Sequence, residues 1–156
     1  MFIETETYRT ILNNVTNICV DVCLRYDNRF LLIKRTEEPC KGIYWPIGGR
    51  IHKGEKSEDA ARRKILEEIG IEFTGELKPC GFYEDTYTEM SLGVMDYSTI
   101  SICWLGYLNK EQISEIKLDD TSEGYAFNST LPERFKIRTF EDFGRPYWYL
   151  HGVGQI

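Results

Sequence analysis

The stretch from Gly49 to Ile71 restricts the possible folds of this chain more than any other part of the sequence. It reads GRIHKGEKSEDAARRKILEEIGI, a glycine turn followed by an amphipathic helix. At 100° per residue, one side of the helix carries Ala61, Ile65, Leu66 and Ile69, and the other carries Arg63, Lys64, Glu67 and Glu68. We therefore expect the first side to pack against a core and the second to face a site.

Signals at both ends predict a helix from about Glu58 to Ile69. Ser57 is a suitable N-cap residue, and Gly70 stands where a helix ends in a left-handed residue. Glu55 and Arg63 are expected to form an ion pair that ties the turn to the helix.

The adjacent acids Glu67 and Glu68 point to metal chemistry. Carboxylates and backbone carbonyls are good ligands for Mg²⁺, which stabilises the charge of a diphosphate. A carbonyl at Gly48 or Gly49 can approach such an ion because no side chain intervenes. The alternative is a solvated helix face with ordinary spaced charge pairs.

The same stretch resembles the Nudix signature, which is glycine, five residues, glutamate, seven residues, then Arg-Glu-apolar-x-Glu-Glu-x-Gly-apolar. The matching residues are Gly49, Glu55, Arg63, Ile65, Glu67, Glu68, Gly70 and Ile71. The resemblance implies an α/β fold, a Nudix-type α/β/α sandwich with a mixed β-sheet between helices. It also implies hydrolysis of a nucleoside diphosphate derivative, with Gly49, Glu67 and Glu68 as metal ligands and Glu67 in a catalytic role.

Lys64 departs from the signature, because it stands where the first glutamate of the Arg-Glu pair is expected. It precedes Glu67 by three residues and Glu68 by four, so its ammonium can reach either carboxylate. A lysine cannot serve as the carboxylate base that many Nudix enzymes have here. Either the base comes from elsewhere, or the site binds without turnover.

One Nudix subfamily, the GDP-mannose mannosyl hydrolases, also lacks this glutamate and resembles residues 1 to about 128 of this chain. The likeness covers MFIETETYRTILNN, NICVDVCLR, FLLIKRTEEPCKGIYW, GGRIHK and GFYEDTYTEMSLGVMDYSTISICWLGYL. It implies attack at the sugar carbon, with GDP as leaving group, Mg²⁺ on the diphosphate and a late-loop histidine as base. It also implies a homodimer.

By this resemblance Arg35 contacts the diphosphate and assists catalysis, Arg50 lies beside it, and Asp21 helps to hold the nucleotide base. The planar guanidinium of Arg35 suits bidentate diphosphate binding; otherwise it is an ordinary surface arginine. Asp21 lies in the apolar run Ile18 to Leu24, where an acid is costly unless paired. A structural salt bridge is therefore the alternative for Asp21. Trp45 is expected in the core.

The late loop KLDDTSEGYAFN has no histidine, so the base must differ from that of the subfamily. Asp119, Asp120 and Glu123 are the acids of this loop, and we select Asp120 as the general base. The alternative is that these acids form an Asx-type turn. His52 and His151 are not expected to be catalytic.

Composition favours a single domain over residues 1–156, which has 42% hydrophobic residues and no low-complexity segment. Five cysteines without metal-binding spacing predict free thiols and a cytoplasmic location. We expect no signal peptide and no membrane span. A net charge of -6 argues against a nucleic-acid partner and for a small-molecule substrate captured locally.

Alternating and apolar runs predict strands at Ile18–Arg25, Phe30–Lys34, Cys80–Glu84, Ser98–Leu108 and Tyr125–Asn128, with a terminal helix at Thr139–Tyr149. The first two strands should form a hairpin. Together these features predict a Mg²⁺-dependent Nudix hydrolase of a nucleotide sugar, GDP-mannose or GDP-glucose, that releases the sugar. The alternatives are a nucleoside diphosphate-sugar pyrophosphatase and a catalytically weak nucleotide-binding sensor.

Overall fold

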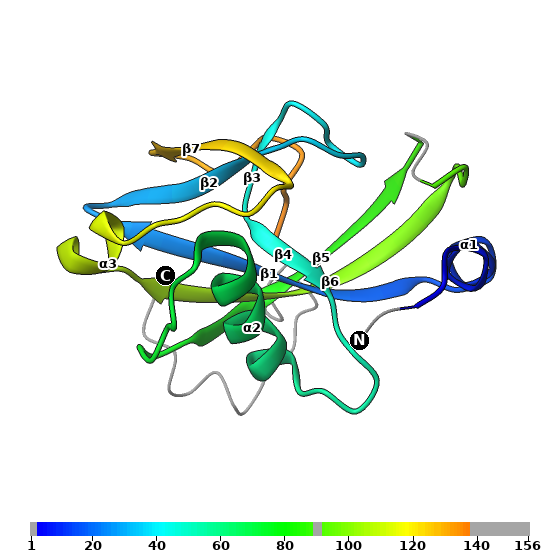
Figure 1. Cartoon of the computed structure of the whole chain (residues 1–156), viewed down its shortest axis with the longest axis horizontal. Coiled ribbons are helices and arrows are strands. Elements are labelled where there is room, and N and C mark those ends of the chain that lie inside the picture. The colour runs from blue at the N-terminus through cyan, green and yellow to red at the C-terminus, as the bar shows by residue number, and fades with distance from the viewer. Residues whose placement is uncertain (1–2, 89–91, 138–156) are drawn as a thin grey trace, which may run out of the picture.

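A computed structural model describes residues 3–88 and 92–137 of the chain, with three helices around a seven-stranded sheet (Figure 1). The helices are α1 (Thr5–Asn14), α2 (Ser57–Ile69) and α3 (Lys110–Ser114). The strands are β1 (Asn17–Tyr26), β2 (Arg29–Arg35), β3 (Tyr44–Trp45), β4 (Ile47–Arg50), β5 (Lys78–Tyr87), β6 (Tyr97–Tyr107) and β7 (Ser122–Asn128).

The sheet is mixed and centres on β1. Its main path runs β3-β2-β1-β6-β5, while β4 pairs with β1 and β7 pairs with β2. The β1–β6 pair is parallel and the other pairs are antiparallel. Between Cys19 and Val22, β1 pairs with β4 on one side and β6 on the other. The middle of β1 is therefore held from both edges.

The predicted strands and the mixed α/β class are confirmed, with small changes of bounds. The first hairpin turns at Asp27 and Asn28, whose positive φ angles of 47° and 59° suit the tight turn of an antiparallel pair. Strands β3 and β4 and helices α1 and α3 were not predicted from the sequence. The predicted helix Thr139–Tyr149 lies outside the described residues.

Two apolar clusters cover the two faces of the sheet, because side chains alternate along β1. Val22 and Leu24 pack in the cluster under α2, with Ile65 and Ile69 of that helix. Cys23 belongs to the opposite cluster, whose other buried members include Leu12, Trp45, Tyr83, Tyr87, Tyr97, Cys103 and Phe135. Trp45 is thus a core residue, as predicted.

Helix α2 ends as predicted but differs from prediction at its start and on its faces. Gly70 is left-handed, with φ of 70°. The N-cap is Lys56 rather than Ser57, and no side chain caps the helix, because Ser57 already forms its first turn. Leu66 is 50% exposed and Glu68 is buried, so the predicted assignment of these two side chains to faces is wrong.

The five cysteines carry no disulfide, in agreement with the prediction of free thiols. No helix within residues 3–88 and 92–137 is long and apolar enough to cross a membrane.

Candidate active site

The glycine turn between β4 and α2 is fastened to the helix by Arg63. Its Nε and Nη2 atoms donate to the two carboxylate oxygens of Glu55 at 2.7 and 2.9 Å. Nη2 also donates to the carbonyl of Arg50, and Nη1 donates to both oxygens of Glu67 at 3.1 Å. The hydrogen bonds from Arg63 lower the pKa of Glu55 to about 2. The predicted Glu55–Arg63 pair is confirmed, and it holds the glycine turn against α2.

Lys64 lies between the two carboxylates that were predicted to bind metal. Its ammonium is 3.1 Å from Oε2 of Glu67 and 3.0 Å from Oε1 of Glu68. Burial acts to lower the pKa of Lys64, but the charge of Glu68 and the hydrogen bonds to both acids outweigh it and raise the pKa. Lys64 is therefore a charged member of this acidic cluster, as its spacing predicted.

Glu68 is nearly enclosed, with 9% of its side chain exposed. The backbone N–H of Gly48 donates to Oε1 of Glu68 at 3.3 Å. Burial raises the pKa of Glu68 in spite of the neighbouring Lys64 ammonium. A buried carboxylate needs a compensating cation, and here Lys64 supplies it.

The donor chemistry of this cluster suits one cation. Glu67 and Glu68 offer carboxylate oxygens toward a common point, and the Lys64 ammonium occupies that point. In the described part of the chain, no three His, Cys, Asp or Glu side chains form a group that could hold a metal ion. With only two carboxylates, Glu67 and Glu68 would hold at most a single ion, in the place of Lys64, and a backbone carbonyl or water would have to complete its ligands.

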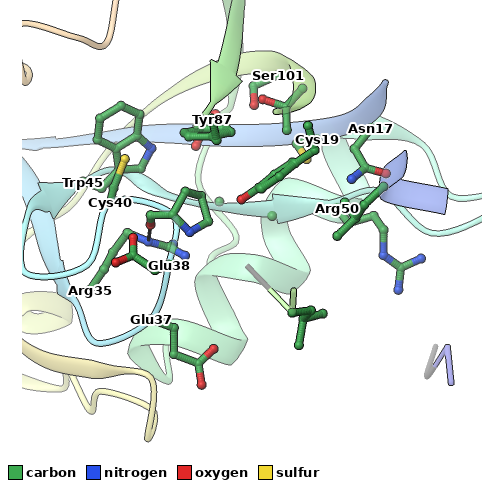
Figure 2. Close-up of a pocket in the computed structure, with 18 of the residues that line it drawn as sticks. Asn17, Cys19, Arg35, Glu37, Glu38, Cys40, Trp45, Arg50, Tyr87 and Ser101 are labelled. Atoms are coloured by element: carbon green, nitrogen blue, oxygen red, sulfur yellow. Dashed lines mark hydrogen bonds between the residues drawn. The ribbon is translucent and has the colours of Figure 1, made fainter. Parts of the chain in front are cut away.

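A pocket of about 310 Å³ opens beside this cluster and has Gly48 and Gly49 of β4 in its lining (Figure 2). Trp45 and Tyr87 line it as aromatic surfaces, and Arg35 and Arg50 lie at its two ends. The volume and the mixed lining suit a small organic group. Other lining residues come from α1 and the start of β1 and include Tyr8, Leu12, Asn17 and Cys19.

Asp21 forms the buried polar part of this pocket. It is 6% exposed, and Ser101 and Trp45 form hydrogen bonds with its carboxyl group. Burial raises the pKa of Asp21 to about 7, although the hydrogen bond to Ser101 acts in the opposite direction. A Cβ atom on Gly48 would lie 2.3 Å from Oδ1 of Asp21, so only glycine allows this close approach. Within residues 3–88 and 92–137 Asp21 forms no salt bridge, and it instead lines the pocket as a hydrogen-bonding group.

A second pocket, of about 180 Å³, lies between the end of β2, α2 and the start of β7. Lys64 and Glu68 line it on the helix side, and Thr121 and Ser122 line it on the strand side. It shares Arg35, Glu37, Pro46, Gly48 and Gly49 with the larger pocket. The two pockets thus form one continuous site with a polar half and a half rich in aromatic groups.

Arg35 and Glu37 stand at the junction of the two halves. Arg35 Nε donates to the carbonyl of Pro39 at 2.7 Å, which directs the guanidinium across the loop after β2. Glu37 lies on the helix side of this junction, apart from Arg35 and Glu38 (Figure 2). Glu37 was not predicted as a site residue, since nothing in its immediate sequence neighbours distinguishes it from a solvated loop acid.

The remaining predicted residues are less closely grouped. Arg50 lines the larger pocket and lies over the ring of Tyr8, 5.4 Å from its centroid. Asp120 is exposed and is not among the residues that line either pocket. Asp119 accepts from the backbone and hydroxyl of Thr121 and from the hydroxyl of Ser122, which is the turn that was considered as the alternative.

Comparison with known proteins gives a family match over most of the chain. Residues 15–138 match the model of the NUDIX domain. The chain is 33% identical over 85 residues to the low-salt glycan biosynthesis protein Agl8 of Haloferax volcanii, covering 54% of each protein. It is 38% identical over 68 residues to the ADP-ribose pyrophosphatase of Methanocaldococcus jannaschii, covering 44% of this chain and 39% of the relative. The match thus spans about half or less of each relative.

A solved structure shares the fold. The MutT protein from Methanosarcina mazei Go1 superimposes with a TM-score of 0.59 at 24% identity, over 73% of this chain and 77% of that protein. The expected mixed sheet with flanking helices is therefore the fold of a known structural class.

Proposed function

The chain belongs to the NUDIX domain family, and from this premise we propose that it hydrolyses a nucleotide sugar into the free sugar and a nucleoside diphosphate. GDP-mannose and GDP-glucose are the first substrates to test. The relative from Haloferax volcanii is named for glycan biosynthesis, which supports a sugar-linked substrate.

The observation that carries this proposal is the continuity of the two pockets. The larger half has a volume of about 310 Å³, aromatic walls and the buried hydrogen-bonding carboxyl group of Asp21. These features suit a nucleobase or a sugar. The smaller half presents Lys64 beside Arg35, which suit a diphosphate. A nucleotide sugar has both kinds of group in one molecule, joined through the diphosphate.

Arg35 is proposed to bind the diphosphate at the junction, and Arg50 to lie at the far end of the larger half. NUDIX hydrolases generally use divalent ions; Mg²⁺ held by Glu67, Glu68 and the Gly49 carbonyl would stabilise negative charge on the diphosphate. In the reaction, a water oxygen bonds to the sugar carbon while the bond from that carbon to the diphosphate oxygen breaks. The leaving oxygen keeps the electron pair, and a base removes the proton of the water.

Two carboxylates are candidates for that base. Asp120 is the residue predicted from the sequence, and the loop that carries it reaches the smaller half at Thr121 and Ser122. Glu37 has the stronger geometric support, because it lines both halves of the site at their junction. The acids on α2 are instead occupied by Arg63 and Lys64.

Glu37→Gln and Asp120→Asn separate these candidates. The variant that lacks the base should lose most of its turnover and keep its substrate affinity, since the amide retains the shape of the side chain. Glu123→Gln is the matched control, because Glu123 pairs with Lys34 at the surface. If neither variant loses turnover, both residues are excluded as the general base.

A pyrophosphatase is the second candidate function, because the Methanocaldococcus jannaschii relative is named an ADP-ribose pyrophosphatase. A screen of nucleotide sugars with Mg²⁺ in ¹⁸O-water distinguishes the two reactions. Carbon attack places the label in the free sugar, whereas attack at phosphorus places it in a phosphate product. Label in phosphate would refute the proposed reaction. Tight binding without any product would indicate the sensor.

We also propose a homodimer in the cytoplasm. The five free thiols support a reducing compartment, and the likeness of the N-terminal segment to the mannosyl hydrolases supports the dimer. Light scattering of the purified chain tests the dimer directly.

A further inference from the structure

The Lys64 ammonium occupies the position between Glu67 and Glu68 where a divalent metal ion would bind. It touches Glu67 and Glu68 at 3.1 and 3.0 Å, and only 18% of the lysine side chain is exposed. Its stem packs over the glycine turn, because a Cβ atom on Gly49 would lie 3.0 Å from its Cε. The ammonium is therefore held in place by both its stem and its charge.

A divalent ion and Lys64 compete for the same oxygens. Mg²⁺ binds carboxylate oxygens at about 2.0–2.1 Å, so it cannot share them with an ammonium at hydrogen-bond distance without strong repulsion. Binding of an ion must therefore first break the contacts of Lys64.

The same ammonium is available to an anion. It has three N–H donors, of which Glu67 and Glu68 use two. Lys64 lines the smaller half of the site together with Arg35. A phosphate oxygen that enters this half can accept the third donor of Lys64 and a hydrogen bond from Arg35.

We propose that Lys64 is a built-in cation of the diphosphate site, so that this chain binds a diphosphate even in the absence of a divalent ion, whereas the Mg²⁺ of the proposed reaction must displace Lys64 and therefore binds weakly on its own. This inference rests on the proposed function only in placing the diphosphate in the smaller half. It concerns how the charge is neutralised and is independent of which nucleotide or sugar is carried.

Binding of inorganic pyrophosphate to the full chain in excess EDTA tests the anion part by calorimetry. The unaltered chain should bind, and Lys64→Met should weaken binding by about tenfold or more, because one charge-assisted hydrogen bond is lost. Lys64→Arg should keep most of the affinity. Lys53→Met, at an exposed position of the glycine turn, is the control and should bind like the unaltered chain.

Mn²⁺ binding without nucleotide, followed by electron paramagnetic resonance, tests the metal part. Lys64→Glu should bind Mn²⁺ about tenfold or more tightly than the unaltered chain, since it removes a cation and adds a ligand. If Lys64→Met does not fold, the double variant Lys64→Met with Glu68→Gln takes its place in the pyrophosphate titration. The second change removes the buried carboxylate charge that the loss of Lys64 leaves unpaired.

Failure of the unaltered chain to bind pyrophosphate in EDTA would overturn the inference, as would equal affinity in Lys64→Met. Equal Mn²⁺ affinity in the unaltered chain and Lys64→Glu would overturn it as well. None of these results depends on sugar release, which the ¹⁸O-water screen measures separately.

Discussion

The ion pair between Glu55 and Arg63 yields a prediction whose size and pH range both follow from the structure. Glu55→Gln removes the charge that accepts two hydrogen bonds from Arg63 and one from the backbone of His52. The side chains of the pair are only 15% and 23% exposed. The contacts are therefore poorly screened by water.

The pKa of Glu55 gives the magnitude. It falls from 4.5, the ordinary value, to about 2 in the folded chain, chiefly through the hydrogen bonds from Arg63. A shift of this size corresponds to about 3 kcal/mol of folding free energy at neutral pH. For a domain of this length, such a loss lowers the melting temperature by roughly 6 to 12 °C.

The sign of the pH dependence is fixed by the direction of the shift. Because the folded pKa is depressed, the stabilisation is present above the unfolded pKa of 4.5 and is lost as the pH falls towards about 2. Urea unfolding of both proteins at several pH values should show a difference that is constant above pH 5 and vanishes near pH 2.

Glu58→Gln is the matched control, because Glu58 also pairs with an arginine of α2, Arg62, at 2.7 Å. That pair is 45% and 31% exposed, so its loss should cost less than about 1 kcal/mol. Equal destabilisation by the two variants, or a Glu55→Gln effect that persists at pH 2, would show that the Glu55–Arg63 pair is not the source of this stabilisation.

Three further predictions concern the site. Arg35→Lys keeps the charge but loses the planar donor pair, so kcat/KM should fall by the equivalent of about 1 to 3 kcal/mol; an unchanged value would place Arg35 outside the diphosphate site. Glu68→Gln should reduce turnover by orders of magnitude while circular dichroism stays unchanged, and full turnover would exclude Glu68 from the site. The folded chain retains the Asp21 proton up to a pKa of about 7, so the unaltered chain should lose stability as the pH rises from about 4 to 7. Asp21→Asn should not show this loss, and identical urea-unfolding profiles against pH for the two proteins would contradict the prediction.

The sequence predicted the parts of the fold that depend on local pattern. The long strands alternate, and α2 has a clear C-terminal glycine, so both were found. The short strands β3 and β4 were missed because the run from Tyr44 to Arg50 contains Pro46 and two glycines, which read as a turn. Their pairing with β2 and β1 exists only in the folded sheet.

The site was predicted where spacing along one helix determines the contacts. Lys64, Glu67 and Glu68 meet because they lie three and four residues apart. The burial of Glu68 was not predictable from α2 alone, because it depends on packing against β4, where the N–H of Gly48, twenty residues earlier, donates to Glu68. Glu37 likewise enters the site only because the loop after β2 lines the same pockets as Gly48 and Gly49 of β4, which no local pattern encodes.

The parallel pairing of β1 with β6 determines when the site can first exist during synthesis. Asn17 through Arg25 pair with Thr99 through Tyr107, so about eighty residues separate the partners along the chain (Figure 1). Asp21 depends on Ser101 of β6 for a hydrogen bond. A nascent chain that has emerged from the ribosome only as far as α2 already contains the whole glycine turn and its acids, but β1 lacks one edge partner. Emergence of β6 therefore completes the pocket, and fragments that end before it should fail to bind the ligand.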